Sequence, residues 1–224
     1  MRMLGLIGFI GIFAACAGTP PGVLAGNGDK RHIERQIAAF NHIDFTAYGD
    51  VFVHFGNEYR VDVTADSNIV PHIITKVYDN TLYIAFDLGS YRGLLNPSRL
   101  GLRFDVYTRN IESFFSGGEG SIRIIDIDTA ALTLNHIGEG SFTVTGKAMQ
   151  FVVYMIGEGN IKAENFAVER ASVNIIGATG RVKVWAEEFL EASVNPFGSG
   201  SIKYRGDPAV LIKNNTRRIT KMRQ

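Results

Sequence analysis

Glycine pairs punctuate the chain about every twenty residues between positions 112 and 206. The last glycine of each pair falls at Gly120, Gly140, Gly159, Gly180 and Gly200. The second and fourth residues after it are apolar in every copy. The second-position residues are Ile122, Phe142, Ile161, Val182 and Ile202. An apolar residue at every second position predicts β-strands with one buried face.

One such unit cannot bury its apolar face alone, so successive units are expected to stack. We therefore predict an all-β fold, a parallel β-helix or solenoid of coils of about twenty residues, right-handed by the usual crossover rule. The glycines suit the corners of each coil, where a tight bend needs unusual backbone angles. Stacking at about 4.8 Å places equivalent residues in columns, with Ile122 above Phe142 above Ile161.

Two further columns are predicted just before the glycine pairs. The residue four before each pair is apolar: Phe114, Leu134, Val153, Val173 and Val194. The residue three before it is polar in most copies: Asn135, Tyr154, Asn174 and Asn195. Stacked asparagines can form a hydrogen-bonded ladder. We interpret this column as structural, with ligand contact as the alternative.

The section before the repeat is less regular. Residues 59–65 alternate as a strand, 66–74 are expected to form one short helix, and 76–86 are expected to form a hairpin that turns at Asp79-Asn80. Residues 87–100 are the longest irregular stretch. We expect a strand and hairpin section that covers one end of the solenoid, because uncovered sheet ends invite aggregation.

The N-terminus has the order of a secretory signal peptide over residues 1–15. Arg2 precedes a short apolar run, and small residues follow. The run covers about 20 Å as a helix, less than the ~30 Å hydrocarbon core of a bilayer. Residues 13–16 (FAAC) resemble a bacterial lipobox, which implies that Cys16 is lipidated. Residues 16–35 would then be a lipid-anchored tether, since they are rich in Gly and Pro near their start.

Two alternatives to lipidation remain open: a transmembrane anchor, and a cysteine discarded with the signal peptide. Cleavage would remove one cation, Arg2, and leave 22 cationic and 22 acidic side chains. Lipid rather than charge would therefore hold the chain on the bacterial cell envelope. Ala17 replaces the aspartate that retains some lipoproteins at the inner membrane. The outer membrane is accordingly preferred over the inner membrane.

Composition excludes several classes of protein. The net charge is +1, so no global basic field favours nucleic acid as a partner. One cysteine in 224 residues excludes an internal disulfide and a thiolate zinc site. The five histidines show no metal-ligand spacing and are expected at the surface or partly packed.

The order of these motifs resembles the head GIN domain family. The resemblance rests on residues 45–51 (FTAYGDV), 59–66 (YRVDVTAD) and 80–84 (NTLYI), then on the serial Gly-x-Gly coils and on 206–208 (GDP). It implies an all-β domain of stacked coils over residues 36–212. Family members are labelled autotransporter adhesins, many are bacterial lipoproteins, and their function is largely unknown. The resemblance supplies no catalytic residues.

This sequence departs from the family pattern at Glu119, Glu139 and Glu158, where Ser or Asp is more usual between the glycines. Stacked coils would bring these carboxylates about 5 Å apart at one corner. Such a column would gain from a cation, and calcium is the natural candidate. Alternatively, the glutamates point apart and pair with Arg123 or Lys162. The sequence otherwise calls for no cofactor.

Asp126 and Asp128 are two residues apart, hence on one face of a strand, beside Arg123. Together with Glu139 they are the candidate acids of a carbohydrate-active enzyme on a β-helix scaffold. The alternative is a solvated strand face that ends in a turn. Because no convergent catalytic set is visible, we expect no enzymatic activity.

We therefore expect a lipid-anchored envelope solenoid that acts as a non-catalytic binding or adhesion module; a purely architectural role is a further alternative. Its partners would be the membrane, through the lipid, and a surface glycan or an envelope protein. The expected contact loop holds Tyr91, Arg92, Leu94 and Leu95, unless these leucines are buried in an end cap.

Residues 213–224 form a basic tail, read as a guard on the last coil or a frayed end, with an anionic lipid or polysaccharide contact as the alternative. Its cations are Lys213, Arg217, Arg218, Lys221 and Arg223.

Overall fold

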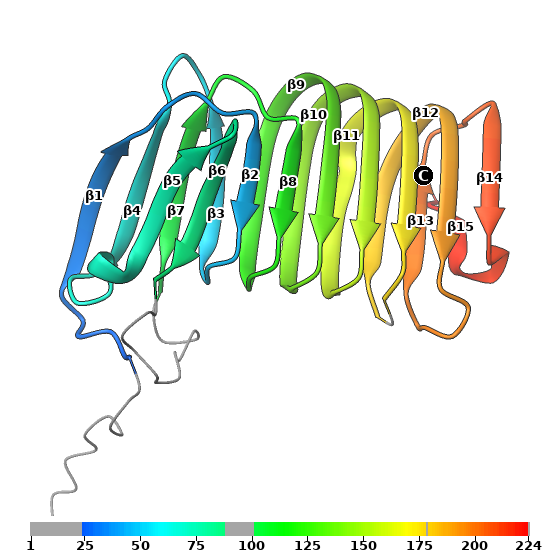
Figure 1. Ribbon diagram of the computed structural model, residues 1–224. Helices are drawn as coiled ribbons and strands as arrows, with labels where there is room; N and C mark the ends of the chain where they lie inside the picture. Colours follow the sequence, from blue (N-terminus) through cyan, green and yellow to red (C-terminus); the bar gives the residue numbers. More distant parts are fainter. Residues whose placement is uncertain (1–23, 88–100, 178, 224) are drawn as a thin grey trace, which may run out of the picture.

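The computed structural model describes residues 24–87, 101–177 and 179–223. They form a flattened β-solenoid whose coils stack from the N-terminal to the C-terminal end (Figure 1). Within these ranges, two short 3-10 turns, η1 (Val70–His72) and η3 (Thr216–Arg218), interrupt the strands. The predicted all-β solenoid of stacked coils with an N-terminal strand section is confirmed.

The strands form two faces. The first face has, in spatial order, β1 (Lys30–Gln36), β4 (Arg60–Asp66), β7 (Arg103–Thr108), β3 (Asp50–Phe55), the first segments of β9 (Gly120–His136), β10 (Glu139–Met155), β11 (Glu158–Ile175) and β12 (Arg181–Val194), then β13 (Ser201–Arg205) and β15 (Ile219–Lys221). The second face has β5 (Ile73–Tyr78), β6 (Thr81–Phe86), β2 (His42–Phe45), β8 (Ser113–Ser116), the second segments of β9 to β12, and β14 (Val210–Asn214).

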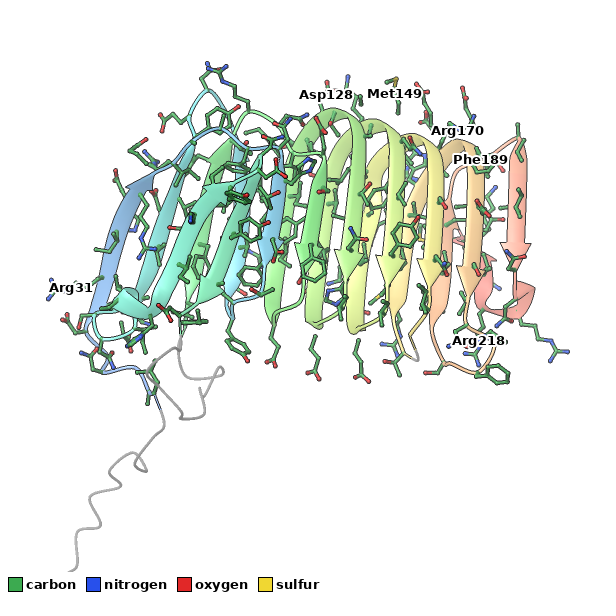
Figure 2. The ribbon with its side chains drawn as sticks, in the orientation of Figure 1. Arg31, Asp128, Met149, Arg170, Phe189 and Arg218 are labelled. Carbon is green, nitrogen blue, oxygen red and sulfur yellow. The ribbon has the colours of Figure 1, made fainter. Side chains whose placement is uncertain are left out.

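Each of the four long strands β9 to β12 runs along one face, crosses an arch and returns along the other (Figure 1). Figure 2 shows Asp128 and Met149 at the arch, opposite the edge where the chain passes from coil to coil. The register shifts at the arch, between Val144 and Gly146 for example, because a sharp bend needs an unpaired residue. The glycine pairs form the opposite edge, which we call the glycine edge.

The core contains the predicted column of second-position residues. Phe142 pairs with Ile122 and Ile161, and the column continues through Val182 to Ile202. Strands outside the repeat extend it with Phe104 and Val51 on one side and Ile219 on the other. None of these side chains is more than 2% exposed. The repeat therefore builds one continuous apolar core.

The last coil departs from the predicted columns. Val194 pairs with Ile175, and Ala192 takes the expected place opposite Val173. Asn195 likewise lies outside the polar column, where Ser193 pairs with Asn174. The cause is that the arches of β11 and β12 differ in length. Ala163 pairs with Val184 and Ala167 with Trp185, so β11 has three residues at the arch that have no partner in β12. Further along, β12 has one extra residue, which leaves a net offset between the two strands. Equal glycine spacing conceals this offset.

Two N-terminal predictions differ in outcome. The hairpin is confirmed, since Asp79 and Asn80 have φ values of 46° and 58° in a two-residue turn between β5 and β6. The helix expected over 66–74 is wrong. Only the three-residue turn η1 forms, because Pro71 has no backbone N–H to continue a helix and Ile73 already enters β5.

The solenoid is also longer than the predicted range 36–212. Residues 30–35 of the expected tether belong to β1, which pairs antiparallel with β4. At the other end β14 and β15 pair with β12 and β13, so residues 213–221 belong to the last coil rather than to a separate tail. Burial of Ile219 in the core column explains this extension.

Backbone approach at the glycine edge explains why glycine recurs there. Gly159 has a φ of +124°, and a Cβ added to it would lie 1.8 Å from the carbonyl oxygen of Gly140. A Cβ added to Gly140 would likewise lie 2.3 Å from the carbonyl oxygen of Gly120. A side chain at any of these positions would push neighbouring coils apart.

Candidate functional site

Several predicted site residues lie outside the part of the chain that the structure describes. These are the lipidation candidate Cys16 and the contact-loop residues Tyr91, Arg92, Leu94 and Leu95. They stay predictions. The remaining candidates can be placed.

The three corner glutamates occupy equivalent places on the glycine edge. Glu139 pairs with Glu158, and Glu119 forms a bridge with Tyr48 in the preceding coil. All three are exposed and rim a shallow depression of about 360 Å³. Among the described residues, none of them has an ion pair, so the alternative pairing with Arg123 or Lys162 does not form.

The glutamate column does not gather ligands for calcium. Within the described residues, the His, Asp and Glu atoms that come within 4.8 Å of one another as a set belong to His32, Glu34 and Asp62. That set lies on β1 and β4, and the guanidinium of Arg60 already occupies the Asp62 carboxylate at 2.9 Å. A cation is present there as a side chain, which disfavours a metal ion.

The candidate acids of an enzyme are dispersed. Asp126 and Asp128 lie at the arch, where Asp126 accepts a hydrogen bond from the Thr145 hydroxyl and Asp128 pairs with Lys147 at 3.1 Å. Glu139 lies on the glycine edge, at the other end of the coil. Glycoside cleavage needs two carboxyl groups facing one another across a bond at roughly 5–10 Å. Glu139 therefore does not face either aspartate, and each aspartate already contacts a side chain of the next coil.

A cationic surface lies instead on the outer side of the first face, over the last coils. Lys162, Lys183 and Lys203 are mutual register partners on β11, β12 and β13, so they form one file with a rise of about 4.8 Å per coil. The adjacent file holds Asn160, Arg181 and Ser201. These six side chains line a groove of about 120 Å³, and we call them the basic face.

Most cations of the basic face lack an acidic partner. Lys183 pairs with Glu164 at 2.9 Å. The side chains of Lys162, Arg181 and Lys203 make no ion pair or hydrogen bond with any residue that the structure describes. Equal charges on neighbouring coils repel one another, and an anion in the groove would relieve that repulsion.

A larger pocket adjoins the basic face at its arch side. It has a volume of about 660 Å³ and is lined by Glu164, Trp185, Arg205 and the last residues of the chain around Lys221. The guanidinium of Arg205 stacks over the Trp185 ring, 4.3 Å from its centroid. The extra residues at the β11 arch place Glu164 here, because a bulge re-aims the side chains beside it.

The N-terminal coils of the same face carry their charges in closed pairs. Asp105 accepts hydrogen bonds from Arg103 at 2.6 and 2.7 Å and contacts His54 at 2.8 Å. Burial alone would raise the pKa of Asp105, but the hydrogen bonds from Arg103 and His54 outweigh it and lower the pKa below its usual value. We call Arg60, Asp62, Arg103, Asp105 and His54 the paired patch.

Sequence reasoning followed the second and fourth residues after each glycine and so missed the basic face. The third residues are Arg123, Thr143, Lys162, Lys183 and Lys203. The same repeat therefore contains the signal, one position away from the core column. Sequence reasoning also placed His136 with the surface or partly packed histidines, whereas it is 1% exposed beneath the second face.

A family model described as "Putative auto-transporter adhesin, head GIN domain" matches residues 39–208. The chain belongs to this head GIN domain family. The match confirms the resemblance seen in the sequence. Membership in a family described as adhesins indicates a binding role at the cell envelope or surface.

One solved structure shows the same fold. A crystal structure from Bacteroides fragilis, described as a "putative adhesin", aligns with 89% of this chain and 100% of its own, at 19% identity and a TM-score of 0.69. A "putative lipid binding protein" and a "putative adhesin", both from Parabacteroides distasonis, align over 90% and 89% of this chain and 100% of their own. Their identities are 19% and 20% and their TM-scores 0.48 and 0.46.

No curated protein matches the chain. Within the described residues, the structure has no helix with the length and apolar character needed to cross a bilayer.

Proposed function

We propose that this head GIN domain protein is a lipid-anchored, non-catalytic binding module of the bacterial cell envelope, and that the basic face is its contact surface. The observation that carries the proposal is the file of three lysines on one sheet, with the guanidinium of Arg181, unpaired among the described residues, in the adjacent file. The in-register sheet fixes the backbone from which these side chains project, so the backbone needs no rearrangement when a partner binds. The family supports a binding role.

The anchor is proposed from the sequence alone. Diacylglycerol and an N-acyl chain on Cys16 would supply several acyl chains, which hold a protein stably where one chain does not. Mass spectrometry of the mature N-terminus tests this. A lipid-modified Cys16 as the first residue is expected; an unmodified Cys16 in the mature protein would refute the anchor. Fractionation of the membranes then tests the preferred outer-membrane location.

The contact surface is tested with two variants of equal charge. The first, Lys162→Gln/Arg181→Gln/Lys203→Gln, neutralises the basic face. The second, Arg31→Gln/Lys76→Gln/Lys147→Gln, removes three exposed cations elsewhere and serves as the control. Binding of the labelled soluble domain to intact cells and isolated envelopes should fall at least tenfold for the first variant only. Equal binding by both variants would reject the basic face as the contact surface.

The segment with Tyr91 and Arg92 remains a second candidate contact. Replacing both with alanine should weaken envelope binding without changing the melting temperature if this segment takes part. Incubation of the protein with a glycan panel tests the enzymatic alternative: no new reducing ends or unsaturated sugars are expected, and their appearance would show turnover.

A further inference from the structure

We propose that the basic face binds an acidic polysaccharide, a chain of sugars with repeated carboxylates that lies along the solenoid axis. This inference rests on the proposed function, because it names the ligand class of the same surface. Three features carry it: the direction of the lysine file, the chemistry of the file beside it, and the place of the exposed apolar side chains.

The lysine file runs along the solenoid axis, so it matches an extended polymer rather than a single anion. Register pairing puts Lys162, Lys183 and Lys203 on three successive coils, and the same file continues toward the N-terminus through Thr143 and Arg123. Each coil thus offers one polar group per rise of about 4.8 Å. A ligand with regularly spaced charges can contact several coils at once, and such linked contacts raise the overall affinity above that of any single contact.

The adjacent file adds neutral hydrogen-bonding groups. It holds, from the N-terminal side, Ser121, Ser141, Asn160, Arg181 and Ser201. Serine hydroxyls and asparagine amides donate and accept hydrogen bonds, as sugar hydroxyls do. Lysines beside hydroxyls and amides therefore suit a ligand that combines carboxylates with hydroxyls. A polymer of phosphates alone would offer only acceptors to this second file, whereas sugar hydroxyls both donate and accept.

Arg205 provides a fixed donor at the end of the lysine file. It follows Lys203 by two residues on β13, and its stacking over Trp185 holds the guanidinium in one plane. A planar guanidinium can bind a carboxylate through two parallel hydrogen bonds. The adjoining pocket has two acids, Glu164 and Asp207, which pair with Lys183 and Lys221. The cations of the basic face and Arg205 therefore remain in excess.

The six residues of the basic face include no apolar side chain that could insert into a bilayer and no aromatic ring on which a base could stack. In the described part of the chain, the exposed large apolar side chains lie at the arch, on the glycine edge, in the hairpin, on the second face and on β14, and none belongs to the basic face. Nucleic-acid strands stack their bases on aromatic rings. Here Arg205 covers the single tryptophan.

The test uses polygalacturonate as the acidic polymer and its fully methyl-esterified form as the matched neutral ligand. Biolayer interferometry of the soluble domain at low salt should show binding to the acidic polymer and at least tenfold weaker binding to the ester. The Lys162→Gln/Arg181→Gln/Lys203→Gln variant should lose at least tenfold in affinity. The Arg31→Gln/Lys76→Gln/Lys147→Gln control should stay within twofold.

Folding is controlled by the melting temperature and by the single variants Lys162→Gln and Lys203→Gln, each of which should weaken binding about threefold. Anionic vesicles and single-stranded DNA form two further arms. Binding of either as tight as that of polygalacturonate would overturn the proposal.

The two proposals fail separately. If polygalacturonate does not bind while the basic-face variant still loses envelope binding, the ligand class is wrong and the contact surface stands. If the basic-face variant binds both polygalacturonate and envelopes as tightly as the wild type does, the ligand class and the contact surface are both wrong.

Discussion

The paired patch and the basic face occupy the same outer surface of the same face, yet they treat charge in opposite ways. In the paired patch, Asp105 and Asp62 are register partners on β7 and β4, and each forms an ion pair with an arginine two residues away on its own strand. In the basic face, lysine stands beside lysine. The two regions even share a file, because Asp105 pairs with Phe52 and Phe52 with Arg123 at the head of the cationic series.

The difference follows from how each region is built. The N-terminal strands come from unrelated segments, some antiparallel, so any residue type can face any other. The last coils are copies of one unit in parallel register, which places like residues beside like. Charges within one file of the repeat therefore do not neutralise one another, and the ion pairs that join neighbouring coils, such as Lys183 with Glu164, connect different files. The outer surface of the repeat is left with charge that an external partner can use.

The largest expected effect comes from Gly159→Ala, which should disrupt the in-register half. Positive φ strain of about 1–3 kcal/mol adds to the clash with the Gly140 carbonyl, so we expect a loss of at least about 4 kcal/mol or failure to fold. Gly56→Ala, in the N-terminal half, is the control, since nothing lies within 4 Å of its added Cβ. Urea unfolding measures both; a loss below about 1 kcal/mol for Gly159→Ala would contradict the close packing of the glycine edge.

Asp105→Asn should cost stability where Lys203→Gln does not. Asparagine is neutral and has one acceptor oxygen, so it cannot replace the carboxylate that accepts two hydrogen bonds from Arg103 and contacts His54. We expect the free energy of unfolding to fall by about 1–3 kcal/mol. Lys203→Gln removes no partner and should stay within about 0.5 kcal/mol. Equal losses in chemical denaturation would mean that the two regions do not differ in the way described.

The two halves should also lose stability in different pH ranges. Burial lowers the pKa of His136 below its usual 6.5, against hydrogen bonds to backbone carbonyls that raise it. The unfolded chain therefore takes up this proton first, and stability should fall by up to about 1.4 kcal/mol per pH unit below about pH 6.5. The pKa of Asp105 is lowered from 3.8, so its contribution is lost only in more acidic solution, as pH falls through that range.

Thermal unfolding of the wild type and of His136→Gln between pH 7.5 and 5 measures the histidine contribution. The variant should show the shallower decline, even if it is less stable at pH 7.5. Parallel declines would show that another group controls this range.

The smallest effect is expected for Lys162→Gln. Removing one of the neighbouring cations should raise stability by a few tenths of a kcal/mol at low salt and by nothing measurable at high salt. Urea unfolding at both ionic strengths, with Lys76→Gln as the control, measures it. Destabilisation at low salt would show that Lys162 has an attractive partner.

Period-two alternation was sufficient to predict the coils and the main core column, because an apolar residue in one copy must lie beside its counterpart when strands stack in register. It could not reveal the arch of β11, where the extra residues Glu164 to Phe166 include one, Phe166, that packs in the core against Phe151. A bulge adds residues to one strand without changing the alternation of apolar and polar residues on either side of it. The positions of Val194 and Asn195 were wrong for this reason.

The site was less predictable than the fold. Lysines three residues after a glycine resemble ordinary solvated positions until the register shows that they share a file. The pairing of β1 with β4 was missed because the charged segment KRHIERQ has little apolar alternation. Its stability comes from an edge of β4 that offers hydrogen bonds, which composition does not report.

The modular coil makes the length of the cationic groove a quantity that evolution can adjust. Duplicating one unit of about twenty residues would add one coil, and with it one more lysine and one more hydrogen-bonding side chain, without any change to the existing coils. Valency toward a long ligand would then grow stepwise with gene length, so relatives with more coils should hold longer chains and release them more slowly.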